Sequence, residues 1–145
     1  MSTLPAAVLF VCTRNSIRSP MAEALLKALV GRSVFVQSAG VSDGELDPFA
    51  VTVIEELGLD LSRHRPRSFE DLADSSFELV ITLSPEADER AQRLARTVSV
   101  DIEYWPTSDP SVVEGSREVR LAAYRALRDE LSNRIEKRFD AKAAP

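Results

Sequence analysis

The chain has 145 residues, of which 44% are hydrophobic and 28% charged, with a formal net charge of −5 and one cysteine. This composition and length predict one globular domain, 1–145, with a sizeable core. The net charge argues against general nucleic-acid binding, no apolar run reaches membrane-span length, and a single cysteine excludes an internal disulfide, which fits a reducing, cytoplasmic location.

Strand and helix patterns alternate along the sequence. In chain order they predict a strand over 6–11, a helix over 18–30, a strand over 33–37, a helix over 47–57, a strand over 77–83, a helix over 85–96, a strand over 98–104 and a helix over 116–139. The last helix has an apolar stripe spaced by three or four, at Tyr124, Leu127, Leu131, Ile135 and Phe139. Residues 140–145 are expected to form a frayed tail.

Alternating strands and helices predict an α/β fold: a doubly wound, four-stranded parallel sheet with helices on both faces. Such sheets bind ligands beyond the carboxyl ends of their strands, near a switch in strand order. Cys12 follows the first predicted strand, and Asp109 lies just beyond the fourth. The topology therefore directs attention to these two side chains.

The loop after the first strand has the composition of an oxyanion site. It reads Cys12-Thr13-Arg14-Asn15-Ser16-Ile17-Arg18-Ser19, and a helical pattern follows. Backbone N–H groups in a strand-to-helix loop converge, the helix N-terminus adds its dipole, and Arg18 supplies a planar fork of donors. The same positive surroundings favour a reactive thiolate at Cys12.

Neighbouring residues strengthen this interpretation over the alternative, a small buried cysteine at a strand end. The Ser19 hydroxyl is placed to hydrogen-bond the thiolate. Asn15 tolerates the left-handed backbone that such a loop often needs, and should hold the loop shape rather than touch substrate. Pro20 falls near the first helical turn, where its missing N–H costs nothing.

Cys12 through Ser19 resembles the phosphate-binding loop of low-molecular-weight protein tyrosine phosphatases, and equally that of their relatives, the arsenate reductases of the same flavodoxin-like fold. The resemblance spans most of the chain, and Ser38-Ala39-Gly40 matches a family triplet placed after the second strand. Residues 58–65 resemble the phosphatase branch of the family. Other segments resemble the reductase branch: Thr13 with Asn15-Ser16, 80–83, and Tyr104-Trp105 followed by Asp109-Pro110.

The resemblance implies that Cys12 is the nucleophile, that Arg18 binds the oxyanion and that Asp109 is the general acid. The oxyanion-binding loop then consists of Thr13, Arg14, Asn15, Ser16, Ile17, Arg18 and Ser19. Asp47, which also precedes a proline, is the rival acid, but a helix starts there at once, so a capping role suits it better. The carboxylate of Asp109 is less clearly committed to a cap.

Three functions remain open at this point. The first is a cysteine-dependent phosphatase that cleaves phosphate monoesters through a thiophosphate intermediate. The second is an arsenate reductase that uses an external thiol such as glutathione, mycothiol or a glutaredoxin-type partner, because no second cysteine exists to relay a disulfide. The third is a non-catalytic module that binds phosphate or another oxyanion. Departures from the phosphotyrosine-directed pattern, Ser111-Val112 after Asp109-Pro110 and 41–45 without an aromatic residue, weigh against protein phosphotyrosine as substrate.

The other residues that could take part in chemistry are expected to have structural roles. His64, the only histidine, lies in a basic segment and is expected to be a solvated loop residue, with a supporting role near an anionic substrate as the alternative. Trp105 is expected to pack at a strand end, and Glu86 to favour a helix dipole. One histidine and one cysteine predict no metal site. We expect no cofactor, no nucleic-acid or membrane partner, and a monomer or weak homodimer.

Overall fold

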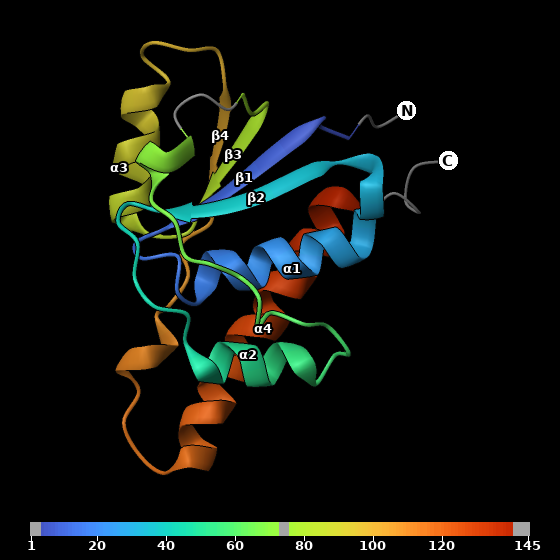
Figure 1. The fold of residues 1–145 in the computed structure, drawn as a ribbon, viewed down its shortest axis with the longest axis vertical. Coiled ribbons are helices and arrows are strands. Elements are labelled where there is room, and N and C mark those ends of the chain that lie inside the picture. The colour runs from blue at the N-terminus through green and yellow to red at the C-terminus, as the bar shows by residue number, and fades with distance from the viewer. Residues whose placement is uncertain (1–3, 73–75, 141–145) are drawn as a thin grey trace.

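The computed structural model describes residues 4–72 and 76–140, and it contains a four-stranded parallel sheet (Figure 1). The strands lie in the order β2-β1-β3-β4 and comprise β1 Ala7–Cys12, β2 Phe35–Gly40, β3 Leu79–Thr82 and β4 Asp101–Tyr104. The chain passes from β1 outward to β2, then returns past β1 to β3. This reversal beside β1 is the switch point at which open α/β sheets bind ligands.

Helices cover both faces of the sheet, as predicted, but unequally. The four α-helices are α1 Arg18–Val30, α2 Pro48–Glu55, α3 Pro85–Leu94 and α4 Arg117–Phe139. Helices α1, α2 and α4 contact one another on one face, whereas α3 packs on the other (Figure 1). Three short 3₁₀ turns complete the described elements: η1 Gly31–Ser33, η2 Phe69–Leu72 and η3 Pro110–Val112.

The central strand β1 divides the core by its alternating side chains. Val8, Phe10 and Cys12 belong to the larger cluster, which α1, α2 and α4 share. Leu9 and Val11 belong to the smaller cluster beneath α3. Because successive strand residues point to opposite faces, a strand buried on both sides is apolar throughout.

The last helix buries its predicted stripe. All five stripe residues are buried, joined by one further apolar residue, and the set is Leu121, Tyr124, Leu127, Leu131, Ile135 and Phe139. The three-to-four spacing therefore identified the face of α4 that packs against α1 and α2. Among the described residues, no helix is long and apolar enough to cross a membrane.

Several predicted boundaries need correction. The second strand starts at Phe35 rather than at residue 33, because Gly31–Ser33 forms a 3₁₀ turn, and it runs on to Gly40. Ser38-Ala39-Gly40 therefore lies within the strand, paired with the end of β1, and not after it. Cys12 is itself the last residue of β1.

Other predicted elements are shorter in the structure. β3 covers 79–82 instead of 77–83, and β4 covers 101–104 instead of 98–104, because the β3–β4 pairing extends over four residues only. α2 ends at 55 and α3 at 94, two residues before the predicted ends. α4 starts at 117 because Ser116 is its N-cap. The expected frayed tail falls, from 141 onward, outside the described residues.

Candidate active site

The loop from Cys12 to Arg18 is held in place by its own carbonyl groups. The carbonyls of four loop residues, Cys12, Thr13, Arg14 and Ser16, accept hydrogen bonds of 2.9–3.1 Å from N–H groups in the segment 41–47. These bonds fix the carbonyls on the outer side of the loop. The segment that follows β2 thus acts as a backbone cradle for the loop that follows β1.

The backbone N–H groups of the same loop, unlike its carbonyl groups, have no hydrogen-bond partner among the described residues. Within the described residues, the backbone N–H groups of 13–17 donate to no protein acceptor. Ile17, the N-cap of α1, has an apolar side chain that cannot cap the helix, so the first turn of α1 also lacks side-chain acceptors. Unpaired backbone donors are costly, and a nest of them beside a helix N-terminus is suited to a tetrahedral oxyanion.

Cys12 lies at the base of this nest with its sulfur held by a hydroxyl. Sγ is 2.9 Å from Ser19 Oγ, in a buried contact, and the cysteine itself is 2% exposed. This contact confirms the predicted hydrogen bond between Ser19 and the sulfur. Either atom can be the donor in this contact, and Ser19 Oγ also donates to the Ala39 carbonyl (3.2 Å). When Cys12 is a thiolate, the nucleophile in cysteine chemistry, only the hydroxyl can donate, and that bond stabilises the thiolate.

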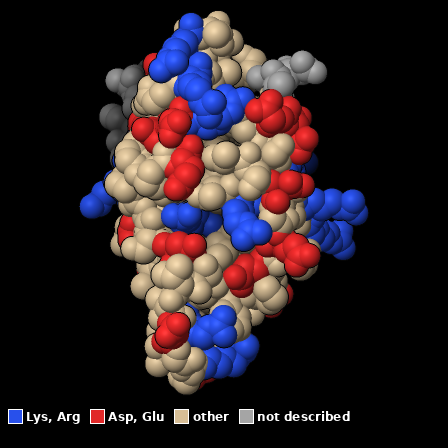
Figure 2. Space-filling view, turned by 90° about the vertical axis from the view of Figure 1, so that its left-hand side faces the viewer, with Lys and Arg blue, Asp and Glu red and all other residues tan. Residues whose placement is uncertain are grey.

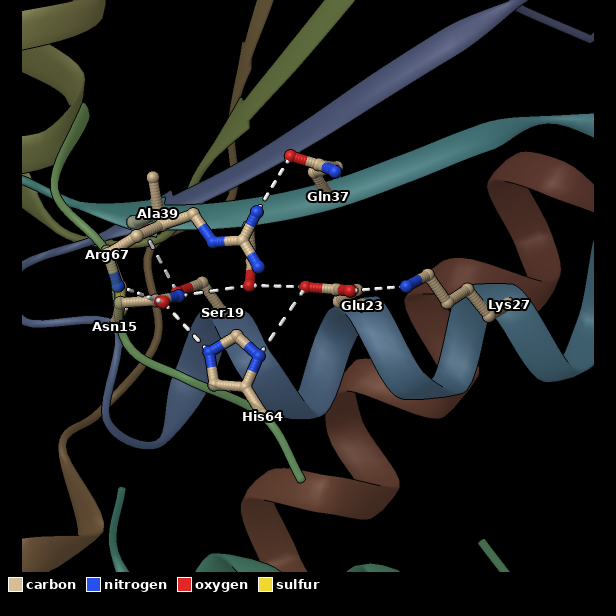
Figure 3. Close-up of polar contacts among 10 residues, drawn as sticks. Asn15, Ser19, Glu23, Lys27, Gln37, Ala39, His64 and Arg67 are labelled. Atoms are coloured by element: carbon tan, nitrogen blue, oxygen red, sulfur yellow. Dashed lines mark hydrogen bonds and ion pairs between the residues drawn. The ribbon is translucent and has the colours of Figure 1, made fainter. Parts of the chain in front are cut away.

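Asn15 holds the turn of the loop, as predicted. Its φ is +55°, and it is the only described residue other than glycine with a positive φ. The side-chain amide donates to Ser19 Oγ (2.8 Å) and Ser38 Oγ (3.0 Å). Its oxygen accepts from His64 Nε2 (2.8 Å) and from the N–H of Arg67 (3.0 Å). Figure 3 shows these partners converging on the buried amide from α1, β2 and the 64–67 segment.

Gly40 explains why the triplet at the end of β2 finishes in glycine. A Cβ at this position would lie 2.6 Å from the backbone nitrogen of Asn15 and 2.4 Å from the carbonyl oxygen of Ser42. Any side chain would therefore push the loop away from the strand that supports it. Close backbone approach, rather than an unusual φ, is what this position requires.

Arg18 reaches the pocket from the first residue of α1. Its Nη1 donates to the carbonyl of Thr107 (3.0 Å), and its Nη2 lies 3.5 Å from Thr13 Oγ1. The Thr13 hydroxyl lies 3.0 Å from Ser84 Oγ and 3.2 Å from Glu86 Oε1. The arginine thus connects the loop to the segment that follows β4. Glu86, which was expected only to favour a helix dipole, accepts a hydrogen bond from the same loop.

Asp109 stands in the pocket wall but is not as uncommitted as expected. Its Oδ1 accepts from the N–H (2.9 Å) and hydroxyl (2.6 Å) of Ser111, so it caps the η3 turn. Cap geometry at this position arises because Pro110 starts a single 3₁₀ turn. Both hydrogen bonds end on one oxygen, which leaves Oδ2 as the atom suited to proton transfer.

Asp47, the rival acid, has both oxygens in structural use. Oδ1 accepts from the N–H of Phe49 (2.8 Å), which confirms the predicted helix cap. Oδ2 accepts from the buried Tyr124 hydroxyl (2.7 Å). Burial and this hydrogen bond to Asp47 raise the pKa of Tyr124 well above its usual range, so the tyrosine remains a donor. Asp47 therefore ties α2 to α4.

The pocket brings together the predicted residues in one cavity of about 880 Å³. Cys12, Arg18 and Asp109 all line it. The rim carries further carboxylates, at Asp43, Glu45, Asp47 and Glu86. On the face at which the strands end, basic and acidic patches alternate (Figure 2). The lining contains no aromatic side chain among the described residues.

The expectation of a solvated His64 is wrong. Its side chain is 6% exposed, and its ring joins Asn15 to Glu23, whose Oε1 lies 3.9 Å from Nδ1. Glu23 also accepts from the Ser38 hydroxyl (2.6 Å) and pairs with Lys27. Burial lowers the pKa of His64, Glu23 opposes this, and Arg67 and Lys27 add to the lowering.

Sequence reasoning missed the buried Glu23–Ser38–His64 set, because these residues come from three separate segments. The only signal was polar residues at positions that the helix and strand patterns would bury. Trp105 packs at the end of β4 as predicted, edge-on to Phe10. Among the described residues, no group of three His, Cys, Asp or Glu side chains is arranged to hold a metal ion.

We expect His64→Ala to lower the free energy of unfolding by about 1–3 kcal/mol, because the Asn15 oxygen loses a buried donor. The loss should depend on pH. Since the pKa of His64 is lowered in the folded state, its stabilising contribution is complete above about pH 6.5 and disappears as the pH falls through the folded-state pKa. Urea unfolding at about pH 7.5 and about pH 5.5 measures both effects.

Arg96→Ala is the control for this variant, since Arg96 is exposed, its side chain hydrogen-bonds to no described residue and it is not among the groups that shift the pKa of His64. It should unfold like the wild type at both pH values. If the two variants lost the same free energy of unfolding, the hydrogen bond between His64 and Asn15 would not be the cause of the loss, and the prediction would be wrong.

The sequence is similar to those of known proteins over most of its length. The family model for low molecular weight phosphotyrosine protein phosphatase matches residues 7–142. An arsenate reductase from Bacillus licheniformis is 36% identical over 132 residues, which cover 91% of this chain and 93% of that protein.

Solved structures show the same similarity. The low molecular weight protein tyrosine phosphatase from T. tengcongensis superimposes with a TM-score of 0.78 at 28% identity, covering 92% of this chain and 97% of that one. An arsenate reductase in its phosphate-binding state superimposes with a TM-score of 0.71 at 28% identity, covering 90% and 94%. The fold prediction is therefore confirmed.

Proposed function

The chain belongs to the low molecular weight phosphotyrosine protein phosphatase family, and from this premise we propose that it is a cysteine-dependent phosphatase that hydrolyses phosphate monoesters. One observation carries the proposal. Cys12 lines one pocket with the loop that follows it, and within the described residues the N–H groups of 13–17 donate to no acceptor. The Cys12 sulfur lies 2.9 Å from Ser19 Oγ. This arrangement presents a nucleophile and an oxyanion nest to the same atom of a substrate.

In the proposed first step, the Cys12 thiolate attacks phosphorus in line, an S–P bond forms and the P–O bond to the leaving group breaks. Asp109 gives its proton to the departing oxygen, so that the product leaves as a neutral alcohol or phenol. Arg18 turns from the Thr107 carbonyl to the phosphoryl oxygens, where its fork makes two parallel hydrogen bonds.

In the second step, water attacks the phosphorus of the thiophosphate. Asp109, now a carboxylate, takes a proton from that water, the S–P bond breaks and the Cys12 thiolate returns with inorganic phosphate as the product. The loop N–H groups and Arg18 hold the equatorial oxygens in both steps. Because the pocket lining lacks aromatic side chains, the substrate we propose is a monoester whose leaving group is not held by stacking.

Arsenate reduction is the second candidate, favoured by the name of the Bacillus licheniformis relative. Here the thiolate would displace hydroxide from arsenate and form an S–As bond. An external thiol would then attack the Cys12 sulfur, so that a mixed disulfide forms and arsenic leaves two electrons richer, as arsenite. A second external thiol would release Cys12, because the chain has no other cysteine.

A side-by-side assay separates the two candidates. One arm measures p-nitrophenol release from p-nitrophenyl phosphate, and the other measures arsenate-dependent consumption of a supplied thiol. The phosphatase proposal expects the first arm to exceed the second, with no thiol requirement. Thiol-dependent arsenite production with negligible phosphate release would assign the reductase function instead.

We also expect oxidation of Cys12 to be irreversible within the chain. Peroxide that enters the pocket lined by Cys12 converts a thiolate to the sulfenic acid. Without a resolving thiol, the oxidation proceeds to the sulfinic and sulfonic acids. Activity after peroxide should therefore not return when a reductant is added later. Glutathione present during exposure should preserve it, as a mixed disulfide that later reduction releases. Full recovery by a late reductant alone, with no disulfide-linked dimer on a non-reducing gel, contradicts this expectation.

A further inference from the structure

A second cavity, of about 380 Å³, is lined by residues of α1 and of the segment 60–67, and its His64 hydrogen-bonds to Asn15 of the active-site loop. Its walls are strongly basic. Four cationic side chains line it: Lys27, Arg63, Arg65 and Arg67. Glu23 and Asp60 are its two carboxylates, and His64 forms part of the wall.

Both carboxylates are already in use. Glu23 accepts from the Ser38 hydroxyl and pairs with Lys27 (Figure 3). Asp60 accepts from the N–H (2.8 Å) and hydroxyl (2.5 Å) of Ser62, and these bonds lower the pKa of Asp60. Both carboxylates keep their charge, and Asp60 also attracts Arg63. The lining nevertheless carries four cationic side chains against two carboxylates, so the cavity has an excess of positive charge.

The arginines, by contrast, have donors to spare. Arg63 and Arg65 make no hydrogen bond or ion pair with any residue that the structure describes. Arg67 donates from Nη1 to the neutral Gln37 side chain (2.9 Å). It forms no ion pair with a carboxylate among the residues that the structure describes. A concave surface with a positive excess and unused guanidinium donors suits an anion with several acceptor oxygens.

We propose that this cavity is a second oxyanion-binding site, which takes a small phosphate-type anion whether free or carried by a metabolite. The site is linked to the active-site loop through His64. Asn15 donates through its nitrogen to two hydroxyls, so its oxygen is the acceptor and His64 Nε2 carries the hydrogen between them. Nδ1 is then the nitrogen without a proton, and it faces Glu23.

An anion in the cavity favours a proton on that nitrogen. The charged groups around the ring are Glu23 and Lys27 from α1, and Asp60, Arg63, Arg65 and Arg67 from the segment that carries the histidine; β2 contributes the neutral Gln37 and Ser38. A bound anion offsets the cations that oppose protonation. Anion and proton therefore bind cooperatively, and the anion should bind more tightly at lower pH.

The single histidine makes this proposal directly measurable. Cys12, the only cysteine, is first alkylated with iodoacetate, which blocks the active-site nest. Inorganic phosphate is then titrated while the His64 ring resonances are followed by NMR, with sodium chloride of equal ionic strength as the reference. We expect saturable shifts with phosphate and a His64 pKa that rises at saturation. Shifts that chloride reproduces would overturn the proposal.

Two double variants locate the site. Arg63→Ser with Arg65→Ser should weaken phosphate binding at least about tenfold, as loss of two charge-assisted donors implies. Arg32→Ser with Arg96→Ser removes the same charge from exposed positions outside the cavity and should bind like the parent. Equal weakening in both, or in neither, contradicts the assignment. The readout needs no turnover, so it stands apart from the proposed hydrolysis.

Discussion

Replacing Cys12 by serine is expected to reduce turnover of p-nitrophenyl phosphate by a factor on the order of 10⁴–10⁶, the usual loss when an enzyme's nucleophile is removed. A serine hydroxyl is protonated at neutral pH, and the hydrogen-bond partner of Sγ within the described residues is the Ser19 hydroxyl, which is too weak a base to activate it. The same variant should still bind phosphate, since the nest of N–H groups belongs to the backbone of 13–17.

Two comparisons make this result specific to chemistry. Ser19→Ala removes the hydroxyl that contacts the sulfur, and the loss of that contact should slow turnover by a smaller factor, about tenfold. The variant also loses the hydrogen bonds of Ser19 with Asn15 and with the Ala39 carbonyl, so its free energy of unfolding should be measured beside its turnover. Phosphate binding to Cys12→Ser should exceed that to the double variant Cys12→Ser with Arg18→Ala by about one site in calorimetry. Retained turnover in Cys12→Ser, above about a hundredth of the wild-type rate, would remove the nucleophile from the mechanism.

Replacing Asp109 by asparagine is expected to affect substrates according to their leaving groups. An alkyl phosphate needs a proton on its departing oxygen, whereas p-nitrophenolate leaves without one. Loss of a general acid costs about 10²–10⁴-fold, so kcat/KM for an alkyl phosphate should fall by this factor and kcat/KM for p-nitrophenyl phosphate by much less. The measurement is the slope of log kcat/KM against leaving-group pKa in both enzymes, because kcat/KM reports the step in which the leaving group departs.

Asp47→Asn is the matched control, because the same chemical change is made in the same pocket. Asp47 supports the α2 cap and the Tyr124 hydroxyl, so this variant should lose about 1–2 kcal/mol of stability without a leaving-group dependence. Were the dependence to appear in Asp47→Asn instead, the general acid would be the other aspartate. Equal loss on all substrates in Asp109→Asn would give Asp109 only its structural role as the cap of η3.

The local features of this protein could be predicted from its amino-acid sequence. Apolar strands and the stripe on the last helix predicted the α/β sheet, because burial imposes periods of two and of three to four on neighbouring residues. The order of residues in 12–19 predicted the loop, since its parts act within one turn of chain. The left-handed Asn15 and the contact between Cys12 and Ser19 followed from that same short segment.

The roles of the polar residues outside the loop became visible in the three-dimensional fold. His64 reaches Asn15 across 49 residues of sequence, and Glu23 meets Ser38 across 15. Neither contact has a periodic signature, because each depends on how separate elements pack and not on spacing within one. The same holds for Asp47. Its role as a helix cap was predicted from the sequence, whereas its hydrogen bond from Tyr124, 77 residues away, was not. Local patterns record burial and backbone geometry, whereas the partner of a buried polar group is chosen by the fold that surrounds it.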